Sequence, residues 1–598
     1  MKILFFSPFA NIWEHAFPEG LIAESFAAKD VEVVAVRCAG MLKVHCVAMS
    51  AVGVGPDAPL STREEVCRAC TKRRDLITKE MNFPALIMDA WLQKTDIARV
   101  DELVASVDAT TWTGLEVDGV PLGRYAVYEM WLSNKLVDTH LSPEMWSVYV
   151  GQLRNTLMTY FAARRILEHQ APDAVVVYND HYSVNHAFCA AAWQLGIPSY
   201  TIHGGQHMVR RGESMMMFRS DYGIANLFES AAWEVSRDLP IGADEVALVG
   251  DHFTGLLQAS SAFAYSSKFM GTGATELRTQ LGIAPGAKVL LATMSSEDEL
   301  IGVRLIDAIH TSPQVSLFAD QFDWVDNLFR YAVSHPEVHL VLRLHPRMFP
   351  NKREQVLSPV VTHIMALRDN APANVTFNMP SDGIGLYDLM QIVDLLLNYS
   401  SSVGAELAAF GIPVVTPSNA DFFTYPGELN RIGHTLDEFH QQIEAALAEG
   451  WSIENVRRAF RWYAFLFGRV AVDFSDAVRS RPVAIRPKKP GRMLKLYNWA
   501  AFIFLQHGPL VRERLALRRR ALSAHSSDVL FDVIDSRLDS ASDSALWPAR
   551  TATFDDETAA LRGYLRALSE TLWTGIDEPD SLAGRVRAAL ATDAVGTR

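Results

Sequence analysis

Two apolar segments in the second half of the chain are each followed at once by polar residues, and this pattern constrains the fold most. Residues 339–343 run into His345 and Pro346, and residues 389–397 run into a serine-rich segment at 400–402. Short continuous apolar runs are typical of buried parallel strands. Polar residues that follow such strands collect at the carboxyl edge of the sheet, where open α/β sheets bind ligands. The sequence therefore predicts an α/β fold with a ligand site at that edge.

The segment from Ser400 to Glu406 is expected to begin a helix. Ser400, Ser401 and Ser402 stand at its expected N-terminus, where free backbone N–H groups and the helix dipole suit a phosphate group. Glu406 lies one helical turn further on, from where its carboxylate can accept hydrogen bonds from ribose hydroxyls. Residues 411–413, Gly-Ile-Pro, then close the helix. This spacing predicts a site for a nucleotide.

The residues after the first apolar segment carry the complementary charge. His345 can donate a hydrogen bond to a phosphate oxygen, and Pro346 fixes the backbone so that the ring points into the cleft. Arg343 and Arg347 add positive charge for a leaving nucleotide, on which negative charge develops during transfer. The alternative is that His345 and Pro346 only end a strand.

Alternating strands and helices predict two Rossmann-like domains and a helical tail. Residues 1–265 form the first domain, which includes a mainly helical insertion at 76–170, and residues 266–470 form the second. Residues 471–598 are predicted to be a basic amphipathic segment followed by a small, flexibly joined helical appendage. The first strand–helix turn has no Gly-rich fingerprint, which disfavours an NAD or FAD enzyme.

Two such domains with a His-Pro and a Ser-Ser pair resemble glycosyltransferases of the GT-B architecture, in which two Rossmann-like domains face a cleft. Within these, the chain is similar to bacterial capsule and lipopolysaccharide biosynthesis proteins. In the branches that transfer sialic acid or Kdo from CMP-sugars, the two pairs bind the nucleotide, and they map onto His345, Pro346, Ser400, Ser401 and Ser402. The resemblance implies a CMP- or UDP-sugar donor and a glycan or glycolipid acceptor.

An inverting transfer needs a general base near the incoming hydroxyl. Asp180, which follows the apolar residues 174–178, is the first candidate, and His203 at the end of the next expected strand is the rival. The two residues are expected at the same sheet edge of the first domain. An equal alternative for Asp180 is to cap the helix that starts near Ser183.

An acidic triplet at residues 297–299 follows another expected strand, but it lacks the Asp-x-Asp pattern of metal-dependent GT-A enzymes. Acidic side chains are favoured in the first turn of a helix, so the triplet is expected to start one. We therefore expect transfer without a catalytic divalent ion, with the positive role taken by Arg343, His345 and helix termini.

Four of the five cysteines lie in one short part of the chain. Cys38, Cys46, Cys67 and Cys70 are spaced Cys-x7-Cys-x20-Cys-x2-Cys, and a CxxC pair is a frequent part of zinc sites. The four are predicted as candidate ligands of a structural Zn²⁺, and four reduced, partly buried thiols are the equal alternative. Five cysteines in 598 residues give no disulfide framework, which fits a reducing compartment.

The charge distribution bears on partners and location. A net charge of −14 argues against a general nucleic-acid binder, which needs a basic footprint. No apolar run reaches the ~18 residues of a membrane span and no secretory signal is evident, so a cytoplasmic protein is expected. Residues 481–520 hold eleven Lys or Arg against one acid. This segment suits a helix at the inner face of the cell membrane, or one that docks on the enzyme body.

Other functions stay open beside an inverting glycosyltransferase. A UDP-sugar 2-epimerase of the same architecture needs a dense set of acids in the cleft, and only Asp180 and Glu213 are evident as such. A polyol-phosphate transferase uses a comparable His-Pro and Ser-Ser arrangement. A non-catalytic polysaccharide-assembly protein is the alternative of a different class, although such a protein has no need of Arg343, His345 and Glu406 together.

Overall fold

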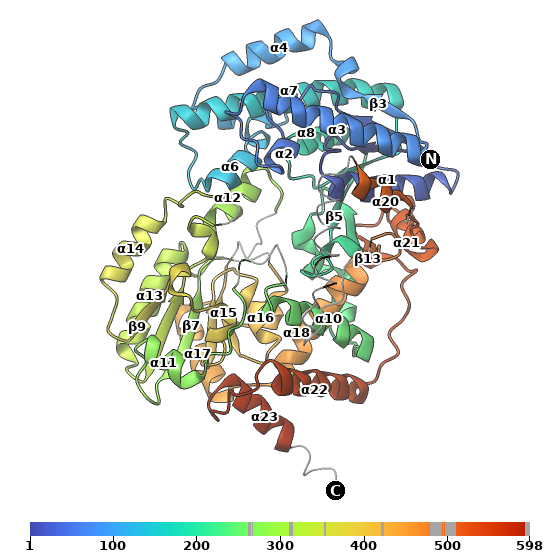
Figure 1. Cartoon of the computed structure of the whole chain (residues 1–598). Coiled ribbons are helices and arrows are strands. Elements are labelled where there is room, and N and C mark those ends of the chain that lie inside the picture. Colours follow the sequence, from blue (N-terminus) through green and yellow to red (C-terminus); the bar gives the residue numbers. More distant parts are fainter. Residues whose placement is uncertain are drawn as a thin grey trace.

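The computed structural model describes residues 1–260, 265, 267–309, 315–351, 354–419, 424–478, 493, 496, 510–518 and 520–592. It contains a seven-stranded and a six-stranded sheet, each covered by helices, in two lobes of the molecule (Figure 1). The predicted fold class is confirmed, because the chain is an α/β protein with two Rossmann-like domains and further helices at its C-terminal side.

The sheet of the first domain has the strand order β13-β6-β5-β4-β1-β2-β3. Its strands are β1 (Lys2–Phe6), β2 (Glu32–Arg37), β3 (Ala85–Ile87), β4 (Ala174–Tyr178), β5 (Ser199–Gly204), β6 (Ser214–Arg219) and β13 (Ala471–Asp473). The strands from β3 to β5 are parallel, and β6 and β13 extend the sheet antiparallel. Along β1, Leu4 and Phe6 enter one apolar cluster and Ile3 and Phe5 enter another. Burial on both faces explains why these strands are continuously apolar.

Helices cover both faces of this sheet and build most of the predicted insertion. They are α1 (Trp13–Ala27), α2 (Val47–Ser50), α3 (Leu60–Met81), α4 (Lys94–Ala105), α5 (Leu122–Tyr125), α6 (Tyr128–Asn134), α7 (Pro143–Gln170), α8 (Ser183–Gln194), α9 (Ala231–Ser236) and α10 (Ala243–Leu257). The long helix α7 begins after Ser142, whose side chain accepts a hydrogen bond from the Met145 N–H at 3.3 Å. This N-cap satisfies one of the free donors at the helix start.

The second sheet is parallel throughout, in the order β12-β11-β10-β7-β8-β9. Its strands are β7 (Lys288–Thr293), β8 (Val338–Arg343), β9 (Val375–Asn378), β10 (Leu395–Asn398), β11 (Val414–Pro417) and β12 (Arg431–Gly433). The long strand predicted for residues 389–397 is wrong in its extent, because Leu389 ends a short helix, α15 (Leu386–Leu389), residues 390–394 form a turn, and only β10 is extended. A buried apolar run does not by itself distinguish a strand from a buried helical turn.

The helices of the second domain include the predicted one after β10. They are α11 (Ala274–Gln280), α12 (Glu297–Leu305), α13 (Gln321–Ser334), α14 (Val361–Asp369), α15, α16 (Val403–Ala408), α17 (Leu436–Glu449) and α18 (Ile453–Phe465). Helix α16 is only six residues long, and Ser402 occupies its N-cap position. Gly411 then turns the chain into β11 with φ of +84°, in the left-handed region that glycine adopts without strain.

The C-terminal helices are not the flexibly joined appendage that the sequence predicts. They are α20 (Val511–Arg518), α21 (Ala524–Asp535), α22 (Phe554–Thr571) and α23 (Leu582–Thr592). Helix α21 packs on α1 in the core of the first domain, whereas α22 packs on α10. The Leu582 N–H at the start of α23 donates to the Gln391 carbonyl of the second domain at 2.9 Å. The tail therefore touches both domains, as its path around the molecule in Figure 1 shows.

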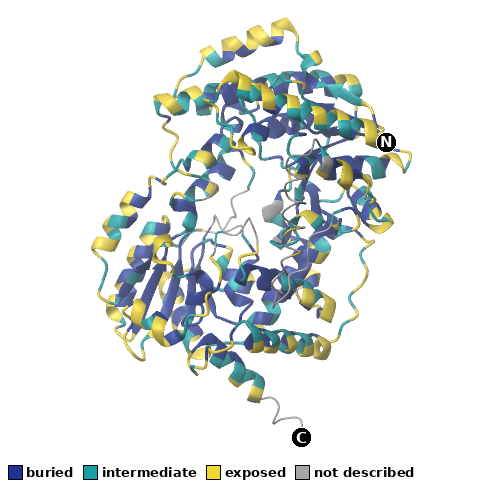
Figure 2. Cartoon of the chain, viewed as in Figure 1, coloured by how far each residue is buried: buried dark blue, intermediate teal, exposed yellow. Residues whose placement is uncertain are grey.

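The two domains meet on two sides. On one side, α6 of the first domain packs on α12 of the second. On the other side, a single buried apolar cluster runs from Met216 of β6 through α10 and α18 to Leu396 of β10. Figure 2 shows buried residues concentrated on the two sheets and continuing into the helices between them. The strand ends that the sequence predicts as functional lie between these two contacts.

Candidate functional site

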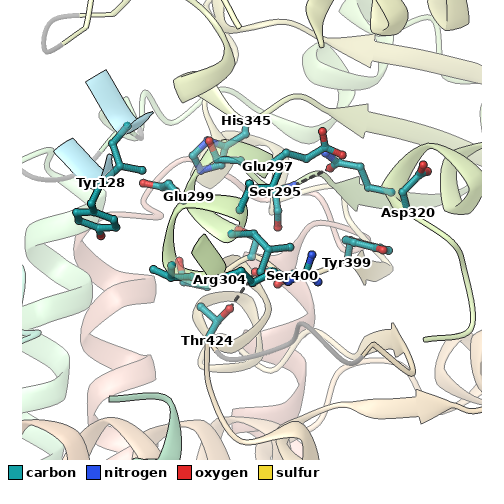
Figure 3. A pocket seen from close by; sticks show the side chains of 18 of the residues that line it. Tyr128, Ser295, Glu297, Glu299, Arg304, Asp320, His345, Tyr399, Ser400 and Thr424 are labelled. Carbon is teal, nitrogen blue, oxygen red and sulfur yellow. Dashed lines mark hydrogen bonds between the residues drawn. The ribbon is translucent and has the colours of Figure 1, made fainter. Parts of the chain in front are cut away.

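A cavity of about 480 Å³ lies between the domains and receives the carboxyl ends of β7, β8 and β10 (Figure 3). Most of its wall belongs to the second domain, and Tyr128 and Leu132 of α6 close it from the first. The polar residues of the second domain that line it are Ser295, Ser296, Glu297, Glu299, Arg304, Asp320, Gln321, His345, Tyr399, Ser400, Ser401, Ser402 and Thr424. The predicted His-Pro and serine segments are thus brought to one place.

The imidazole of His345 is partly buried at the mouth of this cavity and of a smaller one. Its Nδ1 accepts a hydrogen bond from the Arg347 backbone N–H at 3.3 Å, so in the neutral ring the proton is on Nε2. Burial, followed by the charge of Arg347, lowers the pKa of His345 to about 4. The ring is therefore a neutral hydrogen-bond donor at physiological pH.

Arg343 ends β8 and is 8% exposed. Its guanidinium donates to the side chain of Asn378 and, at 3.3 Å, to the Ile384 carbonyl. Burial lowers the pKa of Arg343 to about 10, so the side chain is still a cation near neutral pH. It lines the smaller cavity, which has a volume of about 120 Å³, together with Pro346.

Arg347 does not line any of the cavities described around the site. Its buried guanidinium bonds the Asp298 carboxylate at 2.8 Å, the Glu354 carboxylate at 3.0 Å and the Leu132 carbonyl at 2.6 Å. Although burial opposes the charge, Glu299 and Asp298 raise the pKa of Arg347. Arg347 therefore ties the loop after β8 to α12 and α6. The expected direct contact with a leaving nucleotide does not fit this geometry.

The three serines lie along the floor of the cavity in different environments. The Ser401 N–H donates to Asn398 at 3.1 Å, and the Ser402 hydroxyl donates to Glu406 at 3.0 Å. The Ser400 carbonyl accepts from the Thr424 hydroxyl at 2.9 Å. These bonds fix the loop between β10 and α16, so its hydroxyls face a defined volume.

Glu406 lines the 120 Å³ cavity and a third one of about 240 Å³. Its carboxylate accepts from the Tyr387 hydroxyl at 3.0 Å as well as from Ser402. Burial raises the pKa of Glu406, and these two hydrogen bonds oppose that rise. The 120 Å³ cavity shares His345, Ser401 and Ser402 with the large one and shares Glu406 with the third. The cavities thus form neighbouring compartments of one interdomain site.

Asp180 lies away from these cavities. The residue is 5% exposed, its backbone N–H donates to the Thr201 hydroxyl at 3.1 Å, and burial raises the pKa of its carboxyl group. The alternative role as a helix cap is also not observed, because Glu129 of α6 accepts from the Ser183 N–H at 2.9 Å. Asp180 is linked to the site through His181, whose Nε2 lies 3.8 Å from the Asp180 carboxylate and whose Nδ1 lies 3.4 Å from the Tyr128 hydroxyl.

His203 is held between its own backbone and a cation. Its Nδ1 bonds the Gly204 carbonyl at 2.9 Å, and its Nε2 faces the Arg211 guanidinium at 3.4 Å. Burial, followed by the charge of Arg211, lowers the pKa of His203 to about 3. A ring whose acceptor nitrogen already takes a hydrogen bond from a cation is a poor proton acceptor, so this geometry does not fit a general base.

Several residues of the cavity wall were not predicted as functional, among them Tyr128, Glu297, Glu299 and Asp320. The acidic triplet does start α12 as expected, but Glu297 and Glu299 also line the cavity, whereas Asp298 is buried and paired with Arg347. The signal that could have found Glu297 and Glu299 is their place directly after β7, at the same sheet edge as His345 and Ser400. Tyr128 comes from the other domain, and no local pattern marks it.

The four clustered cysteines line a small separate cavity of about 20 Å³ beneath α3. All four thiols are free and partly buried, and burial raises the pKa of Cys38 to about 12 and also raises the pKa of Cys46. Within the described ranges, no group of three or more His, Cys, Asp or Glu side chains is arranged to hold a metal ion. Bound zinc at Cys38, Cys46, Cys67 and Cys70 stays a prediction.

The basic segment predicted to meet a membrane falls mostly outside the described residues, which omit 479–492, 494–495, 497–509 and 519. None of the helices in the described part of the chain has the length and apolarity that a bilayer crossing requires.

Comparison with known proteins returned solved structures only. No protein-family model matches the chain, and no curated protein sequence matches it. A β-Kdo 2,4-transferase, KpsC, from Thermosulfurimonas dismutans is 15% identical, with 51% of this chain and 82% of that one covered and a TM-score of 0.29. The UDP-GlcNAc 2-epimerase of Neisseria meningitidis is 14% identical over 79% of this chain and 97% of that one, with a TM-score of 0.25.

The calicheamicin glycosyltransferase CalG4 is 14% identical, with 77% of this chain and 94% of that one covered and a TM-score of 0.24. These neighbours include transferases of the kind that the sequence resembles. At such identities and TM-scores the similarity carries no conclusion about activity.

Proposed function

We propose that the chain is a glycosyltransferase that moves a sugar from a nucleotide-sugar to a glycan acceptor. The observation that carries the proposal is the meeting of Arg343, His345, Ser401, Ser402 and Glu406 around neighbouring compartments between two Rossmann-like domains. These residues supply a cation, a neutral donor, two hydroxyls and a carboxylate. That set matches the parts of a nucleotide-sugar, which presents phosphate oxygens beside ribose hydroxyls.

The shared walls suggest how the donor lies. His345, Ser401 and Ser402 border both the 480 Å³ and the 120 Å³ cavity, so a phosphate group fits at their junction. The nucleoside then extends past Tyr387 toward Glu406, which can accept from ribose hydroxyls. The sugar extends in the opposite direction, into the large cavity.

The chemistry of this arrangement is stabilisation of the leaving nucleotide. As the bond from the anomeric carbon to the phosphate oxygen breaks, negative charge grows on that oxygen. The Nε2–H of His345 and the guanidinium of Arg343 lie on the side where this charge appears. We propose an inverting transfer without a catalytic divalent ion, because these groups supply the positive potential. Full activity in a chelator is the expected result.

The acceptor, the donor and the cellular location that we propose are those that the sequence resemblance implies. A surface polysaccharide or a lipid-linked glycan is the proposed acceptor, and the donor is a CMP- or UDP-sugar. The proposed place of work is the cytoplasm at the inner face of the cell membrane, which the basic residues of 481–520 suit.

Nucleotide binding tests the proposal directly. Calorimetry and thermal shift with CMP, CDP, UDP and GDP should find one nucleotide that binds, and His345→Ala should weaken its binding at least about tenfold, because a charge-assisted hydrogen bond of about 1.5–3 kcal/mol is lost. His434→Ala is the matched control, since His434 is an exposed residue of the same domain. If the intact protein binds none of these nucleotides, the proposed function is wrong.

A UDP-sugar 2-epimerase is the second candidate, and one observation now favours it more than the sequence did. Glu297, Glu299 and Asp320 line the large cavity, so the dense set of acids that such an enzyme needs is present. An assay without an acceptor distinguishes the two activities. An epimerase converts UDP-N-acetylglucosamine to its 2-epimer, whereas a transferase leaves it intact or slowly releases UDP.

A further inference from the structure

Neither Asp180 nor His203 is placed to activate an acceptor, so the base must be sought among the groups that face the large cavity. The described carboxylates in its wall are Glu297, Glu299 and Asp320. All three lie across the cavity from the serine loop that follows β10. Their surroundings differ enough to separate their roles.

Asp320 is already used by the fold. Its Oδ1 accepts hydrogen bonds from the backbone N–H groups of Phe322 at 2.8 Å and of Asp323 at 2.9 Å. It therefore caps the start of α13, and both bonds stabilise the carboxylate where it stands. A proton taken up here would weaken the cap.

Glu297 is mostly enclosed beside Asp320 and Asp298. Burial raises its pKa, the Gln321 side chain lowers it, and the two neighbouring acids raise it further. Its carboxyl group thus lies beside other acids at one end of the cavity. That end lies away from Tyr128, where the first domain meets the site.

Glu299 occupies the opposite end of the same wall, at the junction of the domains. Its side chain is 49% exposed, and its Oε1 lies 3.5 Å from Nε of the buried Arg347. It projects toward Tyr128 of α6 in Figure 3, and its charge, after burial, raises the pKa of the Tyr128 hydroxyl. Glu299 is thus an exposed carboxylate of the wall, paired with Arg347 and facing the other domain.

We propose that Glu299 is the general base that activates the acceptor hydroxyl, with Tyr128 forming the facing wall of the acceptor subsite. This inference rests on the proposed transferase function. With the phosphate at His345 and Ser401, the anomeric carbon enters the large cavity between these groups and α12. An acceptor that approaches from the domain junction then passes Glu299 before it reaches that carbon.

The acceptor oxygen forms a bond to the anomeric carbon, while the bond from that carbon to the phosphate oxygen breaks and its electron pair leaves with the nucleotide. The acceptor proton passes to the Glu299 carboxylate, which releases it to water when the product departs. No oxidant, reductant or metal ion takes part.

Glu299→Gln keeps the size of the side chain and removes the proton acceptor. We expect it to slow nucleotide release from the donor by about 10²- to 10⁴-fold, the usual contribution of a general base. The probes are UDP-N-acetylglucosamine, GDP-mannose and CMP-sialic acid, with water or an oligosaccharide as acceptor. Nucleotide affinity should change less than about twofold, because Glu299 does not line the 120 Å³ cavity.

Three further measurements separate a base from a structural role. The fall in rate at low pH should disappear in Glu299→Gln, Glu299→Asp should keep part of the activity, and thermal stability should stay close to that of the intact protein. The groups that face Glu299 are Arg347, Tyr128 and His345. The exposed Glu337→Gln is the matched control.

Unchanged turnover in Glu299→Gln overturns the inference. A loss of nucleotide affinity equal to the loss of rate also overturns it, since Glu299 then acts by holding Arg347 in place. Failure of the intact protein to bind any nucleotide is a different result, which removes the proposed function itself.

Discussion

In the imidazole of His345, Nδ1 accepts a hydrogen bond from the backbone, and Nε2 is left to bind a ligand in the cavity. Because Nδ1 accepts from the Arg347 N–H, the ring has a fixed orientation before any ligand binds. A preorganised donor costs little reorganisation when charge appears on a leaving group. Protonation would place a hydrogen on Nδ1 against that N–H, so the folded protein favours the neutral ring.

This preference predicts a pH-dependent stability difference. The pKa of His345 is lowered to about 4 from its ordinary 6.5, so below 6.5 the unfolded chain binds a proton that the folded protein does not. The contribution of His345 to stability is complete above 6.5 and is lost as the pH falls toward 4. Between pH 7 and pH 5, the intact protein should lose about 2 kcal/mol relative to His345→Gln.

Urea unfolding of both proteins at the two pH values measures this difference, because all other titrating groups cancel. His434→Gln, at an exposed position, should show no such change. An equal gap between the intact protein and His345→Gln at both pH values contradicts the neutral ring.

At the scale of elements, the C-terminal helices act as part of the core. Trp573, between α22 and α23, is fully buried in the apolar cluster that joins the domains. Arg587 of α23 donates to the Trp573 carbonyl at 2.9 Å and to the Ile576 carbonyl at 2.6 Å. An ion pair between Arg461 of α18 and Glu557 of α22, at 2.7 Å, fixes the neighbouring helix.

Trp573→Ala should therefore destabilise the protein by about 3–5 kcal/mol, which is the usual cost of removing a large buried aromatic side chain. Urea unfolding followed by circular dichroism measures the loss, and faster proteolysis within residues 554–592 should accompany it. Leu546→Ala, at an exposed position, is the control and should change stability by less than about 0.5 kcal/mol. If the tail were loosely attached, Trp573→Ala and Leu546→Ala would have the same free energy of unfolding.

At the scale of the whole molecule, polar contacts set the position of one domain against the other. The fully buried Lys135 at the end of α6 donates to the backbone carbonyls of Phe349 and Val356 in the second domain. Arg124 forms an ion pair with Asp307 at 2.8 Å across the same junction. Because the cavity lies between the domains, these contacts also set its width.

Lys135→Met keeps the apolar stem and removes a donor from both carbonyls, although the Phe349 carbonyl still accepts from the Asn351 side chain at 3.2 Å. The expected cost is about 1–3 kcal/mol, for the Val356 carbonyl that is left unsatisfied. The rate of amide hydrogen exchange should rise in α6 and in residues 344–351. The fold-loss of nucleotide affinity should be smaller than the fold-loss of exchange protection. Lys79→Met, an exposed position on α3, serves as the control. Unchanged exchange in Lys135→Met would mean that the domains are held by their apolar contact alone.

The sequence by itself determined the two sheets and the ends of the strands that matter. Buried parallel strands need continuous apolar runs, and polar residues after them must emerge at the carboxyl edge, so His345 and Ser400 could be assigned to one site from local pattern. The start of β10 was missed because the buried residues 389–393, which end α15 and form the turn after it, are also largely apolar.

Only the tertiary structure decided which polar groups face the cavity and which are consumed by other contacts. Arg347 is paired with Asp298, His203 is held by Arg211, and Glu299 is presented to the other domain. The position of the C-terminal helices α20 to α23 is likewise set by their packing on both domains. The pairing and burial of polar groups depend on residues far apart in the chain, so no local pattern encodes them. The burial of a strand, by contrast, can be predicted from the apolar residues of the strand itself.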